Sequence, residues 1–229
     1  MSVENALELV ERGQQFLDSG ELEKSARCYM RAYSIFLSRN KKNYLRDISF
    51  ILELIAQKMK EKAKDLKEAY QYENAAECLS IAYEIYNTLN NIEECKNVIF
   101  EIGLLAISLR DEAHEFMKNN SYQEALRNLN LALGLSRKID DERGEGITLL
   151  QIAKVLAIMG KVNMSLKRFD EAISVLEKYN EHQMVLDTLF EAMQHSQGDS
   201  AKYLEEKIKK LAKDWNKNSF LKKLERSKA

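Results

Sequence analysis

The sequence predicts an all-α fold, on three observations. The 229 residues include no proline and only eight glycines, although average usage would give about 11 and about 16. Apolar residues recur at steps of three and four along most of the chain, which is the spacing of a buried helix face. Helix-breaking residues such as Ser19-Gly20, Asn40 and Gly160 separate these apolar segments.

The breakers divide the chain into successive helical segments with short joints. The first segment, 3–18, ends at Ser19-Gly20, and the segments 43–70 and 92–118 are long enough to form helices of about 40 Å. No joint is long enough to act as a linker between domains. The expected helices are 3–18, 22–39, 43–70, 72–89, 92–118, 122–138, 141–159, 162–178, 182–195, 199–216 and a short one at 218–227.

An internal repeat appears when the chain is compared with itself. Shifts of 50, 50 and 40 residues bring the small residues Gly13, Ala63, Ala113 and Ala153 into one position. Small residues also recur in the partner segments, and large apolar residues occupy the positions between them. This order predicts antiparallel helix pairs that approach closely at the small residues. Ala82 and Ala132 are therefore expected to be buried.

The repeat resembles the tetratricopeptide repeat (TPR), whose signature is small-x-x-aromatic on the first helix and small-x-x-x-aromatic-x-x-small on the second. In the first unit these slots hold Gly13, Phe16, Ser25, Tyr29 and Ala32. The usual period is about 34 residues, so the longer spacing here is similar to long-helix solenoids such as the soluble NSF attachment proteins. The resemblance implies a right-handed α-α superhelix of about five antiparallel helix pairs. Its units would be 3–39, 43–89, 92–138, 141–178 and a degenerate pair from 182, all within an array spanning 1–198.

The C-terminal segment 199–229 differs from the array in charge, with ten Lys and Arg residues against five acidic residues. Leu204, Ile208, Leu211 and Trp215 form one apolar stripe at helical spacing. We expect a capping helix within the same domain. The alternative is contact with a membrane surface or an acidic partner, for which this basic segment is the only candidate.

Composition disfavours several classes of protein. The net charge of −1 and pI near 6.4 argue against nucleic-acid binding. Cys28, Cys78 and Cys95 form no disulfide framework, and no stretch has the pattern of a leader peptide or a membrane span. These features predict a cytoplasmic protein.

No catalytic, metal-binding or cofactor-binding motif stands out. The three histidines, His114, His182 and His195, build no HExxH sequence and no zinc-ligand cluster. Glycine-rich phosphate loops and nucleophile motifs are missing as well. The sequence therefore predicts a protein that is not an enzyme and has no cofactor.

The TPR resemblance further implies a concave groove lined by the first helix of each pair. The ligand-facing slots carry Gln14 and Leu17, then Lys60, Lys64 and Lys67, then Arg110, His114 and Met117, and finally Leu150 and Lys154. These residues predict an interaction module or scaffold that holds an acidic or amphipathic segment of a partner protein. The lysines could equally form an ordinary solvated helix face. The same sequence would also suit a regulatory sensor that binds a small peptide or an anion, or a self-associating structural protein, so that the chain would be a monomer or a homodimer.

Overall fold

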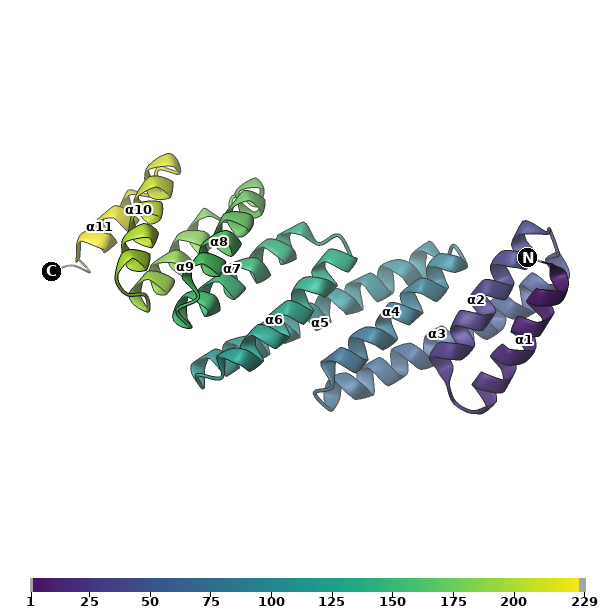
Figure 1. The fold of residues 1–229 in the computed structure, drawn as a ribbon. Helices are drawn as coiled ribbons and strands as arrows, with labels where there is room; N and C mark the ends of the chain where they lie inside the picture. The colour runs from purple at the N-terminus through teal and green to yellow at the C-terminus, as the bar shows by residue number, and fades with distance from the viewer. Residues whose placement is uncertain (1, 227–229) are drawn as a thin grey trace. The chain divides into compact units, whose positions relative to one another are not determined.

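The computed structural model describes residues 2–226, apart from the side chains of residues 199 and 200, and this part of the chain is helical throughout (Figure 1). Each helix begins and ends within two residues of the range expected from the sequence, so the all-α prediction is confirmed. The helices are α1 (Val3–Asp18), α2 (Leu22–Ser38), α3 (Lys42–Glu68), α4 (Tyr72–Thr88), α5 (Ile92–Lys118), α6 (Tyr122–Lys138), α7 (Glu142–Ile158), α8 (Val162–Leu176), α9 (His182–Gln194), α10 (Asp199–Asp214) and α11 (Asn218–Arg226). A 3₁₀ turn, Glu177–Tyr179, extends α8.

The turns between helices share one geometry. Most contain a single residue in the left-handed conformation, as at Gly20, Asn120 and Gly160. The next residue donates its backbone N–H to a carbonyl five residues back, for example Ser121 to Phe116 at 2.8 Å. This is the Schellman arrangement, which satisfies the last carbonyls of a helix and reverses the chain. Tyr70 is the exception in residue type, with φ of 58° at a position that favours Gly, Asn or Asp.

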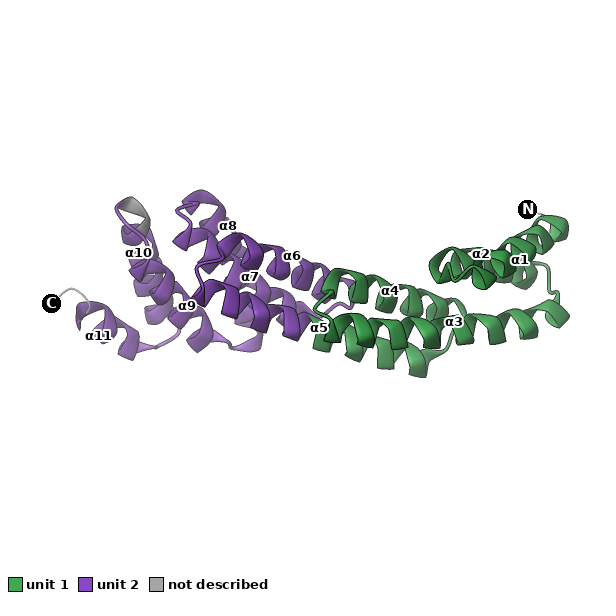
Figure 2. Cartoon of the chain, turned by 90° about the horizontal axis from the view of Figure 1, so that it is seen from below, with its two compact units in different colours: residues 1–105 green, residues 106–229 purple. Residues whose placement is uncertain are grey.

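The chain divides into two compact units, residues 1–105 and 106–229, and the division falls within α5 (Figure 2). In the first unit α1 packs on α2 and α3 packs on α4. Tyr29 and Phe36 are fully buried in this unit. A Cβ atom placed on Gly13 would lie 3.0 Å from the Tyr29 ring, and the Ser25 Oγ donates a 2.8 Å hydrogen bond to the Gly13 carbonyl. The repeat's small residues therefore mark a close approach of α1 and α2.

In the second unit α7 and α8 approach each other closely in the same way. A Cβ atom placed on Gly146 would lie 2.8 Å from the Leu176 Cγ. The Ser165 Oγ donates to the Ala153 carbonyl at 2.8 Å, as Ser25 does to Gly13 in the first unit. Ala82 and Ala132 are both fully buried, which confirms the expectation for the small residues of the second helices.

Helix α10 packs on α9 through the apolar stripe, and α11 packs on α10. Leu204 and Ile208 are buried, and the His182 and Trp215 rings stack with centroids 4.2 Å apart. The Trp215 Nε1–H also donates to Glu177 Oε1 at 3.0 Å. The division into an array and a cap at residue 198 stays a prediction.

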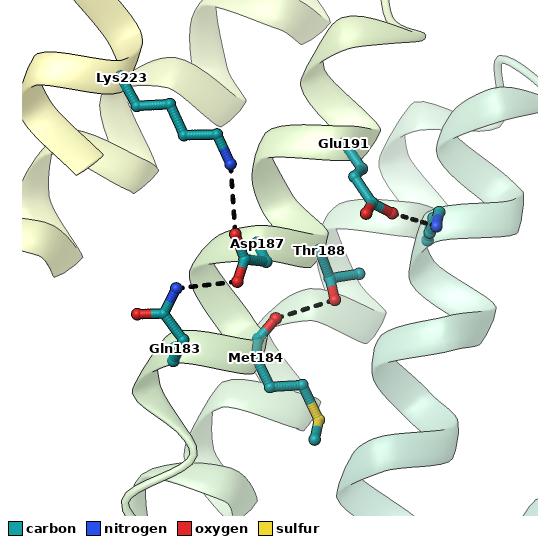
Figure 3. A network of polar contacts seen from close by, with 7 residues as sticks. Gln183, Met184, Asp187, Thr188, Glu191 and Lys223 are labelled. Carbon is teal, nitrogen blue, oxygen red and sulfur yellow. Dashed lines mark hydrogen bonds and ion pairs between the residues drawn. The ribbon is translucent and has the colours of Figure 1, made fainter. Parts of the chain in front are cut away.

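A set of polar links joins successive helix pairs of the second unit. The linked residues are 36 to 38 positions apart in the chain. Figure 3 shows two of them. One joins Lys223 to Asp187, and the other joins Glu191 to Lys154, whose side chain is drawn without a label. The ion pairs among these links are Glu142–Lys178, Arg143–Glu181, Lys154–Glu191, Asp170–Lys207 and Asp187–Lys223.

Candidate binding site

A pocket of about 400 Å³ lies in the first unit among α3, α4 and the beginning of α5. The three lysines expected in the groove, Lys60, Lys64 and Lys67, all line it. They share α3, at steps of four and three residues, which places them on one helix face. The other lining residues are Glu61, Ala63, Ala75, Leu79, Glu101, Leu104 and Leu105.

The floor of the pocket is apolar. Ala63 and Ala75 occupy the small slots of the repeat and are buried, as are Leu79 and Leu105. Leu104 lines the pocket while remaining 41% exposed. Phe100, one turn earlier on α5, is 67% exposed. An apolar surface of this kind next to charged groups is typical of sites that bind protein segments.

Lys60 is held between two carboxylates of α5. Its Nζ lies 3.2 Å from Glu94 Oε2 and 3.2 Å from Glu101 Oε1, and its side chain is 24% exposed. Partial burial alone would lower the pKa of Lys60, but the hydrogen bonds and charges of Glu101 and Glu94 outweigh it and raise the pKa above its ordinary value. Lys60 therefore joins α3 to α5, and its charge is already balanced by these two glutamates.

Lys64 and Lys67 remain as the accessible cations of the pocket. Both are exposed, and within residues 2–226 neither takes part in an ion pair. Glu61, on the same helix, is the exposed carboxylate of the pocket. Two lysines without ion pairs thus line the pocket beside its apolar floor, on the last two turns of α3.

The two residues of α1 that were predicted to face a ligand, Gln14 and Leu17, lie outside this pocket. The Gln14 side chain is occupied by neighbours, since its Nε2 donates to Asp18 Oδ1 at 2.8 Å and its Oε1 accepts from the Tyr29 hydroxyl at 3.0 Å. Leu17 is half-buried. Neither residue lines the pocket of α3 to α5.

In the second unit the expected cations are engaged within the protein. Arg110 is half-buried and donates to Thr148 Oγ1 at 3.4 Å. Burial lowers the pKa of its guanidinium, and the charges of Asp141 and Asp111 partly oppose that shift. Lys154 forms an ion pair with Glu191.

Leu150 requires a correction. It was expected on the ligand-facing surface, but it is 1% exposed because α9 packs on α7 and the two helices share a hydrophobic core. Met117 is half-buried and packs against the same core, whereas His114 is exposed. The predicted slots of the second unit therefore offer little free surface.

Sequence reasoning missed the contribution of α5 to the pocket. The 50-residue repeat relates Phe100 to Phe50 and Leu104 to Leu54, and all four side chains are exposed although large and apolar. Recurrence of apolar residues on the open face of two long helices was the available signal. Glu101, by contrast, could not be assigned to Lys60 without knowing how α5 lies against α3.

Within residues 2–226, no three His, Cys, Asp or Glu side chains come together in a way that could hold a metal ion. None of the helices in this range combines the length and the apolar composition needed to cross a bilayer.

Comparisons with known proteins find similar chains only among solved structures. No family model matches the sequence, and no curated protein matches it. Two similar solved structures are BtubC (BKLC) from P. vanneervenii and the TPR2AB domain of yeast Sti1 in its complex with pHSP90. The first is 11% identical with a TM-score of 0.38, covering 93% of this chain and 91% of that one. The second is 12% identical with a TM-score of 0.28, covering 92% and 98% respectively. The antiparallel helix pairs and the buried small residues of residues 2–226 give this part of the chain a TPR-like helical repeat fold.

Proposed function

We propose that this chain is a non-enzymatic protein-interaction module whose α3–α4–α5 pocket holds an acidic, amphipathic segment of a partner protein. The observation that carries the proposal is the combination of an apolar floor with two unpaired lysines, Lys64 and Lys67. We further propose that it acts in the cytoplasm, since its three cysteines are free, which suits a reducing compartment.

The two parts of the pocket would contribute differently to binding. Apolar side chains of the ligand would cover Leu104 and Phe100, and removal of that surface from water supplies most of the affinity. Carboxylates of the ligand would face Lys64 and Lys67, which steer the encounter and fix the direction of the segment. Because these two lysines are exposed, salt should weaken their part of the interaction.

The test uses a fluorescein-labelled helical peptide of Leu, Ala and Glu with its leucines on one face. Fluorescence anisotropy measures its binding to the full chain, alongside a peptide in which Lys replaces every Glu. We expect the acidic peptide to bind and the basic one to bind much more weakly. Raising the salt from about 50 mM to about 500 mM should weaken acidic-peptide binding several-fold.

A matched pair of variants locates the site. Lys64→Glu with Lys67→Glu should weaken binding at least about tenfold, since each reversal replaces an attraction by a repulsion. Lys58→Glu with Lys62→Glu makes the same change of net charge on the same helix, but these exposed residues lie outside the pocket. Equal weakening by both pairs would show that only net charge matters and would refute the pocket as the site.

A further inference from the structure

A second pocket, of about 300 Å³, lies between α10 and α11 at the other end of the chain. Leu221 and Leu224 provide its apolar lining, and Lys209, Lys213 and Glu225 complete it. Lys209 is paired with Glu205 on its own helix, whereas Lys213 has no ion-pair partner in residues 2–226.

The surroundings of this pocket are basic. Residues 199–226 contain nine Lys and Arg residues against five acidic residues. Three of the cations are engaged by Asp170, Glu205 and Asp187. Others, including Lys210, Lys213, Lys217 and Lys222, have no ion pair within the described residues, so the α10–α11 surface keeps a positive charge.

The exposed face of α1 is acidic and carries an exposed leucine, so it complements the basic, partly apolar surface of α10 and α11. Leu7 is 38% exposed, although it is a large apolar side chain. Glu4, Glu8 and Glu11 follow one another at steps of four and three residues beside it, and all three are exposed. No ion pair engages these glutamates within residues 2–226. The helix carries four acidic residues and a single cation, Arg12.

We propose that α1 of one copy of this chain docks against the α10–α11 pocket of a second copy. Leu7 would enter the apolar pocket, which has room for a leucine side chain, and the glutamates of α1 would face Lys209 and Lys213. Complementary charge and a partly exposed apolar side chain opposite an apolar pocket together favour this occupant over an unrelated one. The two surfaces differ, so the contact is heterologous and each copy keeps one free α1 face and one free pocket. Copies therefore assemble head to tail.

Two charge-reversal variants test the contact. The first changes Glu4, Glu8 and Glu11 to Lys, and the second changes Lys209 and Lys213 to Glu. Light scattering gives the mean mass of each protein between about 1 µM and about 100 µM. The wild-type mass should rise with concentration at low salt and fall toward the monomer at high salt, because exposed charges are screened. Each variant alone should remain a monomer.

A mixture of the two variants gives the sharpest result. The acidic α1 of the second variant can dock in the basic pocket of the first, and the basic α1 of the first variant can dock in the acidic pocket of the second. Their equimolar mixture should therefore regain the concentration-dependent assembly that neither variant shows alone. A chain carrying both sets of reversals has exchanged the two charges, and it should regain concentration-dependent assembly.

Matched controls separate the contact from net charge. Reversal of Asp47, Glu53 and Glu68 to Lys, or of Lys58 and Lys62 to Glu, makes the same change of charge on exposed positions of α3. Neither control should prevent assembly, and circular dichroism with thermal melting should show every variant folded.

Several results would overturn the proposal. They are a wild type that stays monomeric across the concentration range, a dimer that salt does not dissociate, and a mixture of the two variants that remains monomeric. Loss of assembly in the variant with Lys64→Glu and Lys67→Glu would also overturn it, because α1 would then dock in the α3–α5 pocket instead. None of these results bears on peptide binding in that pocket, which anisotropy measures separately.

Discussion

Two glycines inside helices of the second unit should respond in opposite ways to the same substitution. Gly134 lies in α6 and Gly146 in α7. An alanine in a helix interior is more favourable than a glycine by about 0.5–1 kcal/mol, chiefly through backbone entropy. A Cβ atom on Gly134 would meet nothing within 4 Å, so Gly134→Ala should gain this whole amount.

At Gly146 the packing opposes the gain. The added Cβ would lie 2.8 Å from Leu176 Cγ, 2.9 Å from Leu176 Cδ2 and 3.1 Å from Val175 Cγ1. Leu176 is fully buried, so either its side chain and that of Val175 or the two helices must shift to admit the methyl group. Overpacking of this kind costs about 1–3 kcal/mol. Subtracting the helix gain leaves Gly146→Ala destabilised by about 0–2.5 kcal/mol.

Thermal melting followed by circular dichroism at 222 nm measures both effects within one unit. For a chain of this size 1 kcal/mol corresponds to about 2–4 °C, so Gly134→Ala should raise the melting temperature and Gly146→Ala should lower it by a few degrees. Leu176→Val removes part of the obstructing side chain, and the double variant should be more stable than the sum of the single effects. If Gly146→Ala raised the melting temperature as much as Gly134→Ala does, the close approach of α7 and α8 would be wrong.

Three further predictions follow from packing and charge. Ala132→Leu adds three carbons at a fully buried position and should destabilise by about 1–3 kcal/mol in urea titration; an unchanged midpoint would contradict the helix contact. The Lys60→Met variant loses the ion pairs to Glu94 and Glu101. Because the pKa of Lys60 is raised by folding, the stability difference between wild type and this variant should be constant at neutral pH. It should shrink as the pH rises through the folded pKa, above about 10.4, and a difference that grew instead would be inconsistent with the pairing. Truncation after Gly198 removes the side chains that cover α9 and should cause aggregation or a lower melting temperature, whereas an unchanged monomer would mean that α10 and α11 do not stabilise the array.

Helix positions could be predicted closely because they follow from local sequence. Glycine or asparagine marks the left-handed residue of most turns, and the apolar spacing between turns is regular. Tyr70 is instructive, since it adopts the same conformation without a matching residue type. The repeat register located that turn where the local signal was missing.

The candidate site was predictable only in part. Lys60, Lys64 and Lys67 were placed correctly on one face, because periodicity within a helix fixes that arrangement. Whether a residue on a given helix face stays accessible depends on the helix packed against that face. Lys60 is paired with two glutamates of α5, and Leu150 is buried under α9. Contacts of this kind depend on how two helices are positioned along each other, and the spacing of residues within one helix does not give that position.

The polar links between successive helix pairs of the second unit have a mechanical consequence. Each joins surface groups, and an exposed ion pair contributes only about 0–1 kcal/mol to stability. When one pair tilts against the next, however, the lengths of these links change while the buried contacts largely persist. The links at Lys154–Glu191, Lys207–Asp170 and Lys223–Asp187 therefore act as ties that resist bending. Ionic strength should then tune the elasticity of this unit, softening it in concentrated salt while its resistance to unfolding hardly changes.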